Sequence, residues 1–182
     1  FFHPAYGYLY EVEYRPQPEL VNPDWAAEDP RYIPQNARIM LASMPLTPLL
    51  DDPACSGRPI GFGSLFDREC PLLRPDPIGM SLLLTSPAYL LALPVLLRDW
   101  RRRLVAGAAV ATLAIALADL MHFSQGWVQF GYRFSNDFAP FAVLLVALGI
   151  ARLHAGWLSI GLVALSIAVN AWGVYWGVTL GW

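Results

Sequence analysis

Four long apolar runs dominate the second half of the chain. They are Ile78–Leu97, Leu104–Met121, Asp137–Leu153 and Trp157 to about Val178. An α-helix of about 20 apolar residues is long enough to cross the hydrocarbon core of a bilayer. The pattern therefore predicts four transmembrane helices, the first of them kinked at Pro87 and Pro94. We expect Asn170, inside the fourth run, to form a hydrogen bond with a neighbouring helix.

The first 77 residues have a different pattern, rich in Pro, Tyr and acidic side chains. Most of this segment is expected to be loop on the membrane surface, because the prolines from Pro16 onward prevent a long helix. The stretch QNARIMLASM, with Pro34 in its first turn, predicts a helix too short to span and therefore interfacial. The predicted class is thus an all-α integral membrane protein, with an outer-face segment at 1–77 and four transmembrane helices at 78–182.

Composition and charge agree with this division. Of the 182 residues, 56% are hydrophobic and only 14% are charged, against about a quarter in soluble domains. Residues 1–77 carry eleven acids and six arginines, for a net charge of −5, whereas residues 78–182 carry three acids and six arginines, for +3. The whole chain has a net charge of −2. This composition excludes a soluble binding module, and we expect a lipid bilayer but no nucleic acid as partner.

The arginines predict the orientation. The loop at 98–103 holds four arginines and one aspartate, and short basic loops tend to face the cytoplasm. We therefore expect 98–103 and 152–156 to be cytoplasmic, and 1–77 and 122–136 to be extracytoplasmic, in a bacterial inner membrane. On that side Cys55 and Cys70 could form a disulfide, although two free thiols are an equal alternative. The chain begins at Phe1 without a first membrane signal, so we expect a missing N-terminal half of the same protein.

A polar and aromatic island, Gly126–Phe141, lies between the second and third runs, as is typical of a membrane–water interface. Arg133 is a candidate for binding a lipid or substrate phosphate, because guanidinium binds phosphate through two parallel hydrogen bonds. The alternative is a structural pair with Asp137, four residues later. Gln129 and Tyr132 could line the same site.

Asp119 is a further candidate, because carboxylates within a bilayer are costly and often functional. Since it lies one turn from the end of the second run, a solvated interfacial aspartate is the plainer interpretation. No sequence pattern typical of a hydrolase triad, a phosphate loop or a metal site appears, so we expect no cofactor and no metal.

Several strings resemble the C-terminal half of a bacterial group related to the GT-C glycosyltransferases, the broad class that includes protein mannosyltransferases. They are GWVQFGYRFSNDFAPFAVLLVALGI, GMSLLLTSPAYLLALPVLLRDWRRR, YGYLYEVEY and RYIPQNARIMLASMP. The resemblance implies transfer of a sugar from a polyprenyl-phosphate carrier on the outer face. It also implies that the catalytic acid lies in an earlier loop, so that no catalytic residue is in this fragment and the fragment alone is inactive.

A non-catalytic multipass protein, either half of a transporter or a scaffold, is the competing interpretation. Transporters place polar residues at mid-membrane in broken helices. In this sequence the polar groups of the apolar half cluster at the outer interface, which favours an enzyme acting on a lipid substrate at that surface.

Overall fold

The computed structural model describes residues 24–124, 128–154 and 156–182. The tyrosine-rich stretch at 1–23 lies outside the described residues, as do Gly126 and Trp127 of the island. In the described part, regular structure is helical, with three isolated bridges and no strand.

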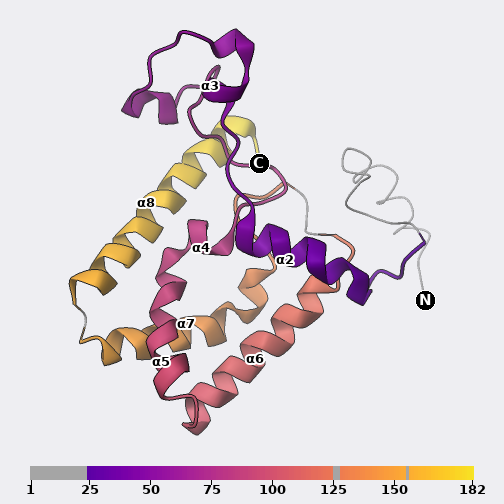
Figure 1. Ribbon diagram of the computed structural model, residues 1–182, viewed down its shortest axis with the longest axis vertical. Helices are drawn as coiled ribbons and strands as arrows, with labels where there is room; N and C mark the ends of the chain where they lie inside the picture. Colours follow the sequence, from indigo (N-terminus) through magenta and orange to yellow (C-terminus); the bar gives the residue numbers. More distant parts are fainter. Residues whose placement is uncertain (1–23, 125–127, 155) are drawn as a thin grey trace.

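Three long helices form the body of the protein: α6 (Arg103–Leu120), α7 (Ser135–Arg152) and α8 (Trp157–Leu180) (Figure 1). Each is long and apolar enough to cross a membrane. Large apolar side chains remain exposed along them, among them Leu113 on α6 and Val178 on α8, with exposed fractions of 70% and 80%. Such surfaces suit contact with a bilayer, since a soluble protein rarely exposes apolar patches of this extent. The protein is therefore a membrane protein, as predicted.

The first apolar run does not form the single kinked helix that we predicted. It is divided into α4 (Leu82–Thr85), the 3₁₀-helix η5 (Pro87–Ala92) and α5 (Leu93–Arg98). Pro87 has no backbone N–H and disfavours helical geometry at Ser86, which adopts φ −139° and ψ 64°. The sequence indicated a kink here, but the result is a break in the helix.

Two side chains from the middle of α8 satisfy the backbone groups that this break leaves without helical partners. Asn170 Nδ2 donates to the Thr85 carbonyl at 2.7 Å, and the Ala88 N–H donates to Ser166 Oγ at 3.0 Å. Unpaired backbone groups are costly inside a bilayer, and here the neighbouring helix pairs them. The interhelical role predicted for Asn170 is confirmed. Ser166 and Asn170 lie midway along α8, away from the polar groups that the sequence places at the interface.

Close packing holds the broken segment against α7. A Cβ at Gly149 would overlap the backbone carbonyl of Leu91 in η5, so only glycine allows this approach. Ala92 and Val95 pack with Val105 of α6 and Leu145 of α7 in one buried cluster. The broken segment is thus an integral part of the helix bundle.

The predicted short helix is present as α2 (Ile33–Ala42), with Pro34 in its first turn. It crosses the C-terminal end of α6 (Figure 1), where the fully buried Asn36 fixes it. Asn36 Nδ2 donates to the carbonyls of Leu120 at 2.9 Å and His122 at 2.8 Å. These carbonyls lie at the end of α6 and just beyond it, where no further helical turn supplies N–H donors. Asn36 was not among the residues predicted from the sequence to have a role.

Between α2 and α4 the chain forms a loop with three short helical turns: α3 (Pro48–Asp51), η3 (Pro53–Cys55) and η4 (Phe62–Leu65). A disulfide joins Cys55 and Cys70, which settles the alternative left open by the sequence. We call residues 45–77 the disulfide loop.

The C-terminal half of α8 holds the disulfide loop through aromatic side chains. Trp172 Nε1 and Trp176 Nε1 both donate to the Leu65 carbonyl, at 3.0 and 3.2 Å, and the Tyr175 hydroxyl donates to the Phe66 carbonyl at 2.5 Å. An apolar ring with one polar atom suits a boundary between lipid and water. The disulfide loop therefore lies at the C-terminal end of α8, the end opposite the arginine-rich turn at 98–103.

Candidate functional site

The candidate residues of the island do not form one cluster but take three different roles. Gln129 is buried, and its side chain forms hydrogen bonds with backbone groups. Its Nε2 donates to the Ile78 carbonyl at 2.6 Å, and its Oε1 accepts from the Arg133 backbone N–H at 2.9 Å. A parallel bridge joins Met80 to Gly131 beside it. Gln129 therefore ties the island to the start of the broken helix.

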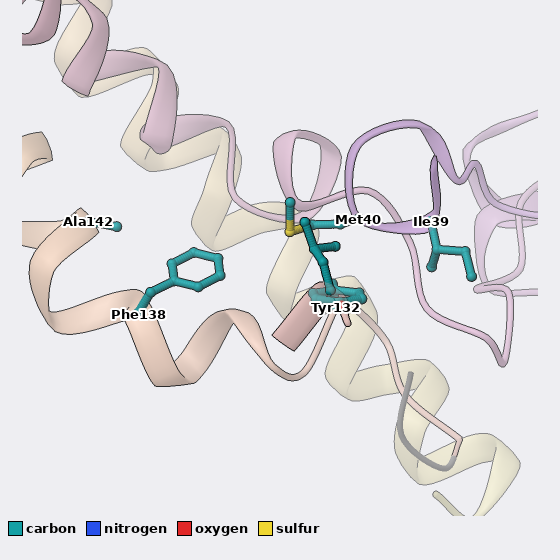
Figure 2. Close-up of a cluster of buried hydrophobic side chains, with 6 residues drawn as sticks. Ile39, Met40, Tyr132, Phe138 and Ala142 are labelled. Atoms are coloured by element: carbon teal, nitrogen blue, oxygen red, sulfur yellow. The ribbon is translucent and has the colours of Figure 1, made fainter. Parts of the chain in front are cut away.

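Tyr132 lies at the centre of the buried cluster where α2, α6 and α7 meet. Ile39 and Met40 of α2 and Phe138 of α7 belong to the same cluster, and only 1% of Tyr132 is exposed (Figure 2). Burial, with a smaller contribution from the Asp119 carboxylate, raises the pKa of the Tyr132 hydroxyl above its usual range. Tyr132 is therefore a neutral hydroxyl near neutral pH.

Asp119 is at the end of α6, near Tyr132. Its Oδ2 and the Tyr132 hydroxyl are both buried and have no hydrogen-bond partner among the described residues. Asp137, in the first turn of α7, is close enough for its charge to act on Asp119. The interpretation of Asp119 as a freely solvated aspartate is therefore wrong for one of its two oxygens. Sequence spacing could not reveal that the island folds back over the end of α6.

Arg133 is exposed, and within the described chain its guanidinium forms no ion pair. The structural pair with Asp137 is therefore not formed, although both residues are near the start of α7. The guanidinium carbon lies 5.8 Å from the ring centre of Phe134. An exposed guanidinium beside an aromatic ring at the end of an apolar helix can bind an anionic group.

An apolar pocket, which the sequence analysis missed, opens at this end of the bundle. Its volume is about 340 Å³. The walls come from α4 (Leu84), α8 (Ala168 and Trp172) and the disulfide loop (Phe62 and Leu73). The lining carries no charged side chain. We call it the α4–α8 pocket. The residues of its walls are far apart in sequence. The spacing of residues along the chain could not predict the hydrogen bonds from Trp172 and Trp176 to the Leu65 carbonyl.

The segment that carries Arg133 adjoins this pocket. Met80 lines the pocket, and its backbone N–H donates a hydrogen bond of 3.1 Å to the Phe130 carbonyl. Phe130 itself packs on Gly173 of α8, where any Cβ would collide with its ring. The candidate phosphate contact and the apolar pocket therefore share one end of the helix bundle.

Within the described residues, no group of three or more His, Cys, Asp and Glu side chains could hold a metal ion. Comparison with protein-family models, with curated protein sequences and with solved structures finds no match.

Proposed function

We propose that this chain holds the carrier lipid of a membrane glycosyltransferase-like protein, which in its complete form transfers a sugar from a polyprenyl-phosphate. The observation that carries the proposal is the α4–α8 pocket, about 340 Å³ in volume, with an apolar lining. Its walls join α4 and α8 to the disulfide loop. A hydrocarbon chain is the ligand that such a lining selects, since it offers contact area and no charged partner.

Arg133 is the group that we propose binds the phosphate of the carrier lipid. A polyprenyl-phosphate has an apolar chain and an anionic head. The exposed Arg133 lies three residues after Phe130, whose carbonyl accepts from the N–H of Met80 in the pocket wall. Arginine binds phosphate through two parallel hydrogen bonds. In this proposal the chain of the lipid occupies the pocket and its phosphate contacts Arg133.

Sugar transfer itself rests on the sequence resemblance to GT-C enzymes. That resemblance implies a catalytic carboxylate in an earlier loop, outside these residues. The present chain would therefore bind and orient the carrier, while chemistry takes place on residues that it does not include. We propose that this happens at the outer face of a bacterial inner membrane.

Photocrosslinking tests the lipid site directly. The full chain in nanodiscs is irradiated with a diazirine-bearing farnesyl phosphate, and the modified peptides are mapped by mass spectrometry. We expect modification of the disulfide loop and of α8 near Ala168. Ala168→Trp fills the pocket and should remove most of this labelling.

Val174→Trp is the matched control, because Val174 is an exposed residue on α8 that does not line the pocket. It should label like the wild type. Equal labelling of all three proteins, or labelling spread evenly over the lipid-facing helices, would refute the pocket as the carrier site.

The orientation can be tested by cysteine labelling, because the two native cysteines are joined in a disulfide. Met44→Cys and Trp100→Cys introduce thiols at exposed positions at opposite ends of the bundle. An impermeant maleimide should label position 44 from outside intact cells, and position 100 only after the membrane is opened. The reverse result would overturn the proposed sidedness.

One observation favours a second candidate function, half of a transporter. The break between α4 and η5 is paired by Ser166 and Asn170 midway along α8, and transporters use broken helices at this depth. In that case Asn170→Leu would abolish uptake into vesicles formed by the full-length protein, whereas filling the α4–α8 pocket would not. The glycosyltransferase proposal predicts no such uptake.

A further inference from the structure

A second pocket lies at the opposite end of the bundle, between α5, α6 and α7. Its volume is about 320 Å³. Asp99, Arg102 and Arg152 supply its polar side, and Val105 and Leu148 are among the apolar residues that complete it. The pocket therefore has one charged edge and one apolar wall. We call it the arginine pocket.

The charges of this pocket do not cancel. Arg102 Nε lies 3.2 Å from one Asp99 oxygen, and Arg152 pairs with the other. One carboxylate therefore faces two guanidinium groups. The Asp99 side chain is only 13% exposed, whereas that of Arg102 is 73% exposed, so the positive partner faces outward.

Further positive charge surrounds this pair. Arg98, Arg101 and Arg103 are exposed on the same turn, at the point where the long apolar helix α6 begins. Arg101 lies over the ring of Trp100, which is itself 58% exposed, an arrangement typical of a membrane interface. This end of the bundle thus carries the residue types expected at the head-group level of a bilayer.

We propose that the arginine pocket binds an anionic phospholipid, with the phosphate against Arg102 and Arg152 and part of an acyl chain against Val105 and Leu148. Basic pockets between transmembrane helices bind anionic head groups in this manner. The apolar wall distinguishes this ligand from a free phosphate ion, which would make no use of it. This site is separate from the proposed carrier site and does not depend on it.

Native mass spectrometry of the full chain, released from detergent in the presence of dioleoyl phosphatidylglycerol or dioleoyl phosphatidylcholine, tests the proposal. We expect tighter binding of phosphatidylglycerol. Arg102→Gln should weaken that binding about fivefold, the effect of roughly 1 kcal/mol for one arginine near a charged lipid surface. Arg102 is exposed, so this substitution should leave the fold intact.

Asp99→Asn is the opposite test. It removes the carboxylate that competes for the two guanidinium groups, so phosphatidylglycerol should bind more tightly, even though the ion pairs are lost and the protein becomes less stable. A purely structural ion-pair network would show the loss of stability without any gain in lipid binding. That result would overturn the proposal.

Arg68→Gln is the matched control, because it makes the same charge change at an exposed position of the disulfide loop. It should leave the preference for phosphatidylglycerol unchanged. An equal loss in Arg68→Gln would show that binding follows net charge alone and would refute a defined site. Displacement of the lipid by glycerol phosphate at equal concentration would show that the pocket accepts the free anion, and would overturn the lipid assignment.

Discussion

Asn170 of α8 donates a hydrogen bond of 2.7 Å to the backbone carbonyl of Thr85, the last residue of α4. Thr85 is buried, so no water replaces this bond if the amide is removed. The same Asn170 amide donates to the Ser166 carbonyl of its own helix at 2.8 Å. One side chain therefore connects α8 to the break in the first apolar run.

We predict that Asn170→Leu destabilises the protein by about 1–3 kcal/mol, the cost of a buried carbonyl left without a partner. Thermal unfolding in detergent, followed by circular dichroism, measures the effect. Thr112→Val is the control, because the Thr112 hydroxyl donates to the Ala108 carbonyl of its own helix and does not join α6 to another segment in the part of the chain that the structure describes. A neutral Asn170→Leu would contradict this prediction, because the buried Thr85 carbonyl would then not depend on the Asn170 amide.

The long helices were predictable because a continuous apolar run specifies a membrane span without reference to any other part of the chain. The predicted runs at 104–121, 137–153 and 157–178 agree with α6, α7 and α8 to within about two residues at each end. The break at Ser86 was less predictable. Proline alone predicts a kink, whereas a full break is tolerated only because Asn170 and Ser166 lie beside it.

The site was harder to predict than the helices, because its contacts join distant segments. Gln129 reaches the Ile78 carbonyl, and Trp176 reaches the Leu65 carbonyl, across 51 and 111 residues of sequence. No local pattern encodes such pairings. The spacing of Arg133 and Asp137 did suggest an ion pair, but Arg133 precedes the first residue of α7, so the helical geometry that the pair needs is absent.

The disulfide between Cys55 and Cys70 gives a second prediction. Maleimide should label neither cysteine in the oxidised protein and both after treatment with dithiothreitol, as counted by intact mass. Removing the crosslink across 15 residues should also destabilise the loop by about 3 kcal/mol, by the chain-entropy estimate. Faster proteolysis at Arg68 would report this loss, since Arg68 is inside the closed loop. Unchanged proteolysis would show that the aromatic contacts from α8 suffice to hold it.

Asp29 predicts a pH dependence near the start of α2. Its hydrogen bond from the Arg31 guanidinium, at 2.6 Å to Oδ2, together with the Arg31 backbone N–H, lowers the pKa of the carboxyl from 3.8 to about 2. Because the folded pKa is the lower one, the charged carboxylate stabilises this turn at pH values above about 4. That contribution is lost as the pH falls from about 4 to 2.

Hydrogen exchange of the Arg31 amide, corrected for its intrinsic rate at each pH, measures this loss. Protection should be constant from pH 7 to 5 and should fall below pH 4. Asp29→Asn retains an acceptor for the amide but not the ion pair, so its protection should be lower throughout and independent of pH. A wild-type transition at pH 5 or above would contradict the assignment to Asp29.

Arg133 provides the test that links structure to the proposed activity. Because its guanidinium has no ion-pair partner among the described residues, Arg133→Ala should leave protein abundance and thermal stability nearly unchanged. Loss of a charge-assisted phosphate contact should lower sugar transfer by the full-length protein at least about tenfold. Arg133→Lys retains the charge but not the two parallel hydrogen bonds, so its transfer rate should lie between those of wild type and Arg133→Ala.

Arg68→Ala is the control, because Arg68 is at an exposed position of the disulfide loop, and this variant should transfer sugar normally. Parallel losses of transfer and abundance in Arg133→Ala would instead assign a structural role to this arginine.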